Sequence, residues 1–235
     1  MSKTRMNFDK AFVIGEAGTC HADDNIDQRF STAIDYVFAA FDAGADAIKF
    51  QMFDNPNKDT MFCWLDGDEE RSERWKESRL SLEEWGRVKD LCDELGIMFL
   101  VSVFEYQTVK WLTALDVKAT KVASRAAGNL DEFLFAPTPL LVSNGMWGVK
   151  KVSGVVILEC EANYPSTARW KDGYTGFSDH SGNPWRAIDA LARGCKLVEV
   201  HFYIDPTDAG PDLLASLTYE ELKLVCEAKD AINSV

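Results

Sequence analysis

The sequence has no long hydrophobic run and no apolar leader. None of its stretches approaches the ~18 consecutive apolar residues that a membrane-spanning helix needs. Its first ten residues, MSKTRMNFDK, lack the apolar segment of a secretory signal. These absences argue against export and against a membrane partner, and we expect a cytoplasmic protein.

Basic residues are also scarce. Lys and Arg number 25 against 38 Asp and Glu, so the formal net charge is −13. Nucleic-acid binding needs a basic surface, and this balance argues against it. A small anionic substrate is still compatible with the sequence, because a few local cations outweigh a diffuse negative surface.

Two kinds of motif are missing as well. The six cysteines include no C-x-x-C pair, and in a cytoplasmic chain of this size they are expected to be reduced and mostly buried. No G-x-G-x-x-G follows the first apolar run, and no glycine-rich phosphate loop is present. Any bound phosphate would therefore be held by side chains.

What the sequence does contain is a series of short apolar runs, most of which end on a polar residue. Such runs are typical of strands that are buried on both faces of a parallel sheet. Helical patterns separate several of them, at residues 29–43, 81–96, 106–115 and 216–232. The runs predicted to be strands are residues 11–18, 47–51, 98–105, 120–124, 140–145, 155–161, 174–180 and 197–202.

Eight strands with intervening helices predict an α/β fold, a (β/α)8 TIM-type barrel, in one domain over residues 1–235. An open doubly wound sheet is the alternative. The connections around the fourth to sixth strands are too short for full helices, so this part of the barrel is predicted to have reduced helices. Residues 53–80 are too long for a simple connection and are predicted to cover the mouth of the barrel.

The predicted strand ends carry ionisable residues. His180 and His201 lie 21 residues apart, about one strand–helix–strand step, and period two places Ser178 with the first and Glu199 with the second. Two imidazoles, a carboxylate and a hydroxyl at neighbouring strand ends form a candidate metal or anion site. A pair of buried, hydrogen-bonded histidines is an equally good interpretation of the spacing.

Other polar residues are expected at the same end of the barrel. Glu16 ends the first strand, and Lys49 and Gln51 share a face of the second. Lys121 and Ser124 lie at the fourth strand, and Ser143 ends the fifth. Barrel interiors are usually filled by branched apolar side chains, so these residues predict a bound phosphate or carboxylate beside a metal.

At these residues the sequence resembles the sialic acid synthase (N-acetylneuraminate synthase) family, whose members condense phosphoenolpyruvate with an N-acetyl hexosamine. The resemblance runs in order along nearly the whole chain. Cys20 and Leu213 stand where the family usually has Asn and His. The motifs that carry the resemblance are EAGTCH at 16–21, AGADAIKFQ at 43–51, KVAS at 121–124, SNGM at 143–146, GFSDH at 176–180, EVHF at 199–202 and GPDLLASL at 210–217.

The resemblance implies a role for each matching residue. His180 and His201 would bind a divalent metal, commonly manganese. Phosphoenolpyruvate would be held by Lys49, Lys121, Ser124, Ser143, Ser178 and Glu199. The sugar or the attacking water would face Glu16, Gln51, Tyr164 and Asp212, with Glu16 as the general base.

The family's usual C-terminal antifreeze-like domain has no counterpart within the 235 residues. Two other functions stay open: a Schiff-base aldolase that uses Lys49 or Lys121, and a non-catalytic homologue that serves as a binding or scaffold protein. We also expect a homo-oligomer. The sequence offers no helix to cover the outer surface of strands 140–145 and 155–161 near Trp147, and a second copy would bury that surface.

Overall fold

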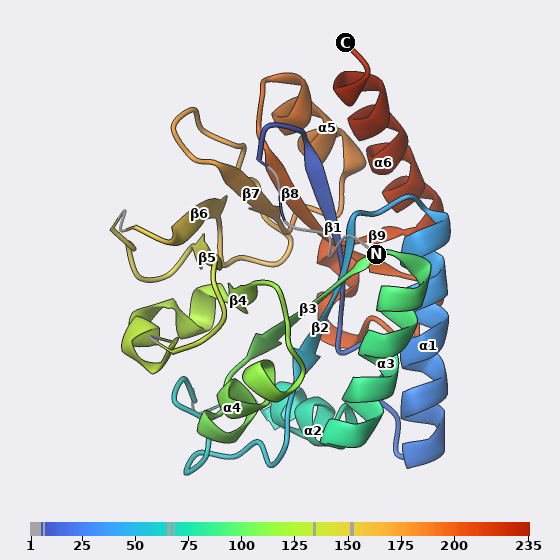
Figure 1. Cartoon of the computed structure of the whole chain (residues 1–235), viewed down its shortest axis with the longest axis vertical. Helices are drawn as coiled ribbons and strands as arrows, with labels where there is room; N and C mark the ends of the chain where they lie inside the picture. The colour runs from blue at the N-terminus through green and yellow to red at the C-terminus, as the bar shows by residue number, and fades with distance from the viewer. Residues whose placement is uncertain (1–5, 7, 65–66, 68, 134, 151–152) are drawn as a thin grey trace.

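The computed structural model describes residues 6, 8–64, 67, 69–133, 135–150 and 153–235. These residues form a closed parallel barrel, shown in Figure 1. Each of the eight barrel strands pairs in parallel with the next one, and β1 pairs with β8 to close the ring, which excludes an open sheet. The barrel strands are β1 (Phe12–Gly18), β2 (Ala47–Met52), β3 (Met98–Val103), β4 (Thr120–Val122), β5 (Leu140–Asn144), β6 (Val155–Cys160), β7 (Gly176–Asp179) and β8 (Leu197–Tyr203).

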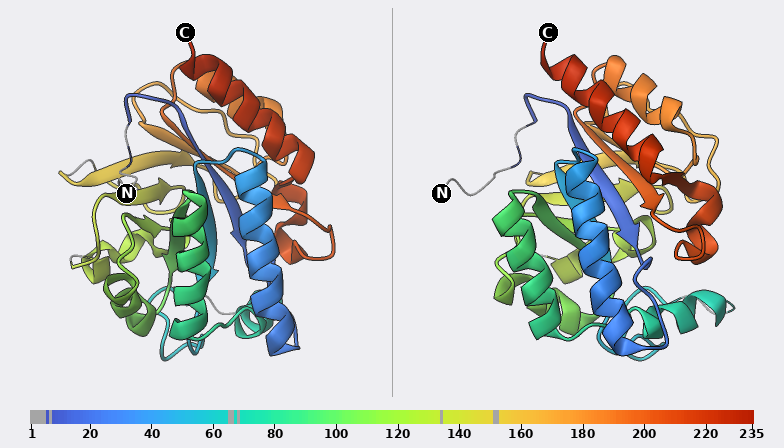
Figure 2. Two further views of the ribbon diagram at one scale, coloured as in Figure 1. Left: turned by 45° about the vertical axis from the view of Figure 1, so that its right-hand side comes forward. Right: turned by 90° about the vertical axis from the view of Figure 1, so that its right-hand side faces the viewer.

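The helices are distributed unevenly around the barrel. Figures 1 and 2 show α1, α3 and α6 side by side over one flank, whereas β5 and β6 are connected by loops. Residues 161–175, between β6 and β7, contain no helix, and neither do the described residues between β5 and β6. The predicted reduction is therefore confirmed. The helices are α1 (Ile26–Asp42), α2 (Glu69–Glu77), α3 (Leu82–Leu95), α4 (Tyr106–Ala114), the 3-10 segment η1 (Ser124–Phe133), α5 (Pro184–Ala192), the 3-10 segment η2 (Gly210–Ala215) and α6 (Tyr219–Asn233).

Helix ends follow local sequence signals. Ser81 caps α3 through a capping box with Glu84, as predicted. The predicted terminal helix over 216–232 begins too early, because Thr218 forms a second capping box with Glu221 and α6 starts at Tyr219. The preceding residues form the short strand β9 (Ser216–Thr218), which pairs with the last residues of β8.

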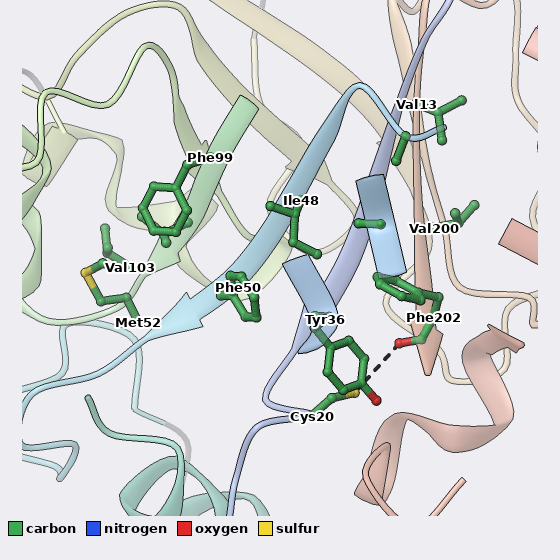
Figure 3. Close-up of a cluster of buried hydrophobic side chains, with 14 of the residues drawn as sticks. Val13, Cys20, Tyr36, Ile48, Phe50, Met52, Phe99, Val103, Val200 and Phe202 are labelled. Carbon is green, nitrogen blue, oxygen red and sulfur yellow. Dashed lines mark hydrogen bonds between the residues drawn. The ribbon is translucent and has the colours of Figure 1, made fainter. Parts of the chain in front are cut away.

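Alternate residues of each strand face the two sides of the barrel wall. The outward set packs against the helices, and Figure 3 shows part of it, with Ile48, Phe50 and Phe202 near Tyr36 of α1 and Val13 farther away. The inward set of the lower half forms a separate apolar layer. Its members are Phe12, Ile14, Ala47, Met98, Leu100, Ala119, Leu141, Leu158 and Leu197, with Met6 beneath them.

The lower layer is tightly filled at β7. A Cβ atom at Gly176 would lie 2.9 Å from the Leu158 Cγ atom and 2.9 Å from the carbonyl oxygen of Leu197. Such contacts are too short for any side chain. Glycine at this position therefore lets β6, β7 and β8 close around the leucines, as interior packing at native density requires.

The outer surface of β5 and β6 differs from our expectation. Val142 is fully buried and Ile157 is 5 % exposed, while Leu140 and Val155 are half-buried. Val142 belongs to the same apolar cluster as Phe133 of η1. The chain's own residues therefore cover part of the patch that we expected a second copy to bury, namely Val142 and Ile157, whereas Trp147 beside it is 54 % exposed. The oligomer itself stays a prediction.

No helix among the described residues is long and apolar enough to cross a membrane.

Candidate active site

A cavity of about 750 Å³, its open mouth included, lies at the carboxyl ends of the barrel strands. Its lining includes all twelve side chains predicted from the sequence except Asp212. Those eleven are Glu16, Lys49, Gln51, Lys121, Ser124, Ser143, Tyr164, Ser178, His180, Glu199 and His201. The structure thus brings together residues that come from seven strands and their loops.

Lys49 occupies one side of the cavity floor. Its Nζ atom lies 2.6 Å from Glu16 Oε2, and β1 and β2 place these two residues in register. The ammonium group also donates to Ser102 Oγ at 2.9 Å and lies 3.8 Å from Glu199 Oε2. Lys49 is 3 % exposed, so its charge is balanced by these groups rather than by water.

Lys121 occupies the opposite side of the floor. Its Nζ atom donates to Ser143 Oγ at 2.7 Å and lies 3.4 Å from Glu199 Oε1. Ser178 Oγ donates to the same carboxylate oxygen at 2.8 Å. Glu199 therefore lies between the two lysines, and two serine hydroxyls surround it and Lys121.

Burial and neighbouring charges act in opposite directions on these groups. Burial raises the pKa of Glu199, but the charges of Lys121 and Lys49 together lower it by more. The pKa of Glu199 therefore lies below the usual range of a carboxyl group. Burial dominates at Glu16 and raises its pKa, against the opposing effect of Lys49. Burial likewise lowers the pKa of Lys121. The floor is a buried charged layer in which the two lysines face the two carboxylates.

The two histidines lie above this layer. Their ring centroids are 5.4 Å apart, and both Nε2 atoms approach one point, the hydroxyl oxygen of Tyr164, at 3.1 Å for His180 and 3.5 Å for His201. His180 Nδ1 lies 2.8 Å from the carbonyl oxygen of Glu161, which can only accept. His180 therefore carries its proton on Nδ1, and its Nε2 lone pair faces the cavity. Burial, followed by the nearby His201, lowers the pKa of His180 to about 3.

Asp212 lies behind His201 and outside the cavity lining. Its Oδ2 atom is 4.0 Å from His201 Nδ1, and its Oδ1 atom accepts from Arg71 Nη1 at 2.9 Å. Burial raises the pKa of Asp212, but His201 and Arg71 together lower it by more, so the carboxyl group stays charged. Arg71 also lies over the ring of Tyr164, with 5.6 Å from the guanidinium carbon to the ring centroid.

The histidines offer a partial metal site. Two imidazole Nε2 atoms that converge on one point suit a divalent cation such as manganese or zinc. Within the part of the chain that the structure describes, no group of three or more His, Cys, Asp or Glu residues is placed to hold a metal. The residues therefore fit a cation that takes two ligands from the protein and the remaining ligands from substrate and water.

Ser124 closes the cavity wall at the end of β4. Its Oγ atom accepts from the amide of Gly145 at 3.1 Å. A Cβ atom at residue 145 would lie 2.7 Å from that oxygen, so only glycine allows the β5 end to approach the serine this closely.

Several residues at the cavity were not predicted. Ser102 lies within an apolar run. The only sequence signal for it is the period of two along β3, which places Ser102 on the same inward face as Met98 and Leu100. Arg71 and Trp75 come from α2 in the 53–80 segment, which was predicted to cover the mouth but not residue by residue. Arg125 follows Ser124 and lies over the Trp75 ring at 5.2 Å. The lining thus has four cations, two lysines and two arginines, against two carboxylates.

Comparison with known proteins gives consistent results. A family model described as NeuB family matches residues 36–235. The chain is 30% identical over 260 residues to an N,N'-diacetyllegionaminic acid synthase of Legionella pneumophila, covering 94% of this chain and 72% of the relative. It is also 30% identical over 249 residues to the spore coat polysaccharide biosynthesis protein SpsE of Bacillus subtilis, covering 90% of this chain and 65% of that protein.

A solved structure shares the fold. The crystal structure of an N-acetylneuraminic acid (sialic acid) synthetase from Leptospira borgpetersenii, in complex with citrate, superposes with a TM-score of 0.76. That comparison covers 97% of this chain and 85% of the other, at 22% identity, which supports the barrel architecture.

Proposed function

The chain belongs to the NeuB family, and on that basis we propose that it condenses phosphoenolpyruvate with an N-acetyl hexosamine-type aldehyde to give a nonulosonic, sialic-acid-like 2-keto acid and phosphate. Relatives of the family are named as sialic, legionaminic and pseudaminic acid synthases, which supports a synthase or transferase role. Because the chain spans only 65% to 72% of the two curated relatives described above, the complete reaction is a proposal for this chain.

The observation that carries the proposal is the charged layer on the cavity floor. Phosphoenolpyruvate bears a phosphate and a carboxylate, and Lys49 and Lys121 lie on opposite sides of Glu199 with hydroxyl groups beside them. Charge-assisted hydrogen bonds from two ammonium groups suit two anionic groups of one small molecule. In a chain of net charge −13, the cavity gathers four cationic side chains, with two carboxylates in its lining and Asp212 behind Arg71, and this local concentration of positive charge supports an anionic ligand.

In the proposed reaction, the methylene carbon of phosphoenolpyruvate bonds to the aldehyde carbon of the open-chain sugar, whose oxygen becomes a hydroxyl group. Water adds to the former enol carbon and loses one proton, which balances the proton taken up by the aldehyde oxygen. Cleavage of the bond between that carbon and the phosphate-bearing oxygen then releases phosphate, and the remaining proton of the added water leaves as the keto group forms. Glu16 would accept the proton from water. Its raised pKa suits that role, because general bases work best near the operating pH.

The sugar would occupy the upper part of the cavity. Gln51, Tyr164 and the two histidines line it there, and Asp212 holds its negative charge behind His201. His180 and His201 would bind a divalent cation, which we propose to be manganese. When bound, that cation would supply Lewis-acid polarisation of the aldehyde oxygen.

One observation favours the Schiff-base aldolase. Lys121 is 2 % exposed and burial lowers its pKa, as in lysines that attack carbonyl groups. Its ion pair with Glu199 and its hydrogen bond to Ser143 oppose this function, because they stabilise the ammonium form and a Schiff base needs the neutral amine. Borohydride added with substrate would trap a Schiff base covalently on this lysine, and the condensing enzyme would leave the protein mass unchanged.

The test of the proposed function is release of phosphate from phosphoenolpyruvate across a panel of N-acetylated hexosamines, with and without manganese. We expect release that requires a sugar and is abolished by a chelator. Lys121→Ala should weaken phosphoenolpyruvate much more than sugar. The proposal would be refuted if none of the sugars in the panel supported phosphate release. It would also be refuted if Lys121→Ala weakened the binding of both substrates equally.

A further inference from the structure

Several polar groups of the connection after β6 converge on one carboxylate, that of Glu161. Glu161 Oε2 accepts hydrogen bonds from Ser166 Oγ at 2.7 Å, from the amide of Thr167 at 2.9 Å and from the amide of Ala168 at 3.1 Å. Its Oε1 atom accepts from Asn163 Nδ2 at 3.2 Å. These contacts close residues 161–168, hereafter the Glu161 loop, into a compact turn around one side chain.

The Glu161 loop is also bound at both ends to His180. The backbone carbonyl of Glu161 accepts from His180 Nδ1 at 2.8 Å, and the amide of Ser166 donates to the carbonyl of His180 at 2.7 Å. The first bond fixes the imidazole tautomer, and the second fixes the end of β7 against the loop. Any change in the shape of the loop therefore reaches His180 directly.

Tyr164 lies in the middle of this loop. Its ring stacks on His180 at 4.3 Å between centroids, and its hydroxyl contacts the Nε2 atoms of both histidines. The residues around it on the loop, from 162 to 165, are exposed. The tyrosine is therefore held by its contacts with the histidines and Arg71 and by the polar bonds that shape the loop. Those bonds come from Glu161 and from Arg186 Nη1, which donates to the carbonyl oxygens of Thr167 and Ala168 at 2.7 Å and 3.0 Å.

The bonds to Glu161 are of the strong kind. A carboxylate that accepts from hydroxyl and amide donors forms charge-assisted hydrogen bonds, which are roughly twice as strong as neutral ones. The bonds from Ser166 and Thr167 lower the pKa of Glu161, so it is charged at neutral pH.

We propose that Glu161 is a positioning residue, whose carboxylate shapes the Glu161 loop so that Tyr164 Oη and His180 Nε2 face each other across the sugar end of the cavity. The geometric part of this inference stands alone, and its relevance to catalysis rests on the proposed function. Glu161 itself does not line the cavity. It acts through the tyrosine and the histidine, as residues behind metal-binding histidines commonly do.

The experiment compares Glu161→Ala and Glu161→Gln with wild type, and uses Glu94→Ala, an exposed glutamate on α3, as the matched control. The chain has three histidines, so long-range ¹⁵N NMR of the imidazoles can be assigned with one His variant at a time. Hydrogen exchange of the peptide that contains Thr167 and Ala168 reports on the loop. Titration with manganese alone and with phosphoenolpyruvate alone reports on the two ends of the cavity.

In wild type we expect His180 in a single tautomer with the proton on Nδ1. Glu161→Ala should give a tautomer mixture, fast exchange at Thr167 and Ala168, and manganese binding weaker by about tenfold. Glu161→Gln keeps an acceptor oxygen and should recover part of each effect. Phosphoenolpyruvate affinity should not change, because Lys49 and Lys121 lie on other strands.

A Glu161→Ala protein with the wild-type His180 tautomer and protected Thr167 and Ala168 amides would overturn the inference. So would equal losses in Glu161→Ala and Glu94→Ala, or weakened phosphoenolpyruvate binding in Glu161→Ala. Failure of the proposed function looks different, because wild type itself would then bind no phosphoenolpyruvate while the tautomer and exchange results stand.

Discussion

The lower and upper halves of the barrel interior are built on the same strands but do opposite things. On the inward face of β8, Leu197 is followed two residues later by Glu199 and then by His201, and these are 0 %, 3 % and 6 % exposed. The depth of burial is therefore nearly the same along the strand, and only the chemistry of the side chains changes. The lower residues fill the barrel, whereas the upper ones place charges where water cannot reach them.

This difference separates stability from function. Burial of the lower apolar layer favours folding, by roughly 25 cal/mol per Å² of apolar surface. The upper layer carries Glu16, Lys49, Lys121 and Glu199 out of water, and ion pairs in such places rarely recover the full desolvation cost. A sequence that keeps a costly arrangement at one end of its barrel has a functional reason for it.

The largest predicted effect comes from making the upper layer resemble the lower one. Lys121→Met should reduce phosphate release from phosphoenolpyruvate by about 10²–10³-fold, because a main source of positive charge for the substrate is gone. It should also lower the free energy of unfolding by about 3 kcal/mol, because the buried Glu199 loses the nearer of its two lysine partners.

The double variant Lys121→Met with Glu199→Leu should recover most of that stability and none of the activity, as measured by urea unfolding and phosphate release. Activity in the double variant would show that the charged upper layer is not needed for the reaction.

The converse prediction concerns the lower layer. Leu141→Ala removes a fully buried side chain and should reduce the free energy of unfolding by about 3 kcal/mol, through lost burial and the cavity left behind. Its turnover per folded molecule should equal that of wild type at a temperature where both are folded. Loss of turnover without loss of stability would show that the lower layer takes part in the site.

The sequence predicts the division between the apolar and charged layers well for the barrel strands and poorly for α2. The apolar runs and their polar ends predict the strands and most of the floor, because period two places Lys49 with Gln51, and Glu199 with His201, on the inward face. Arg71 could not be predicted, because α2 lies in a charged segment with no apolar periodicity and its position depends on long-range contacts such as that with Asp212.

The cover over β5 and β6 was missed for a related reason. No helical pattern marks it, and loop residues do the packing. Trp147 illustrates the point: it lies against Gly128 of η1, where a Cβ atom would be 2.9 Å from its ring, and its Nε1 donates to the carbonyl of Arg125. Such contacts between loops leave no periodic signal in a sequence.

A third prediction uses the histidine outside the barrel interior. His21 is buried between Phe50 and Trp85, and burial lowers its pKa from 6.5 to about 4. The unfolded chain therefore binds a proton that the folded chain rejects, so stability is full above pH 6.5 and is lost as the pH falls toward 4. Between pH 7.5 and pH 5 this should cost about 2 kcal/mol.

His21→Gln retains a donor for the carbonyl of Ser78 and should remove that part of the pH dependence, measured by urea unfolding at both pH values. An unchanged slope in this variant would contradict the assignment. The variant thus isolates a buried histidine with a structural role from the two histidines of the cavity.

The smallest predicted effect lies at the periphery. Ser81→Ala removes the capping box of α3 and should cost about 1 kcal/mol in unfolding free energy, with phosphate release unaffected. Thermal melts and turnover measured on one preparation check both parts. A change in turnover here would mean that the helical flank is coupled to the site more strongly than the two-layer comparison allows.

The most direct test of the central claim, that the upper layer of the barrel is a phosphoenolpyruvate site, is a crystal structure with phosphoenolpyruvate and manganese bound. We predict phosphate and carboxylate oxygens within hydrogen-bond distance of Lys49, Lys121 and Ser143, with the metal between His180 and His201. Phosphoenolpyruvate bound outside this cavity, a covalent adduct on either lysine, or a metal that the two histidines do not ligate would contradict it.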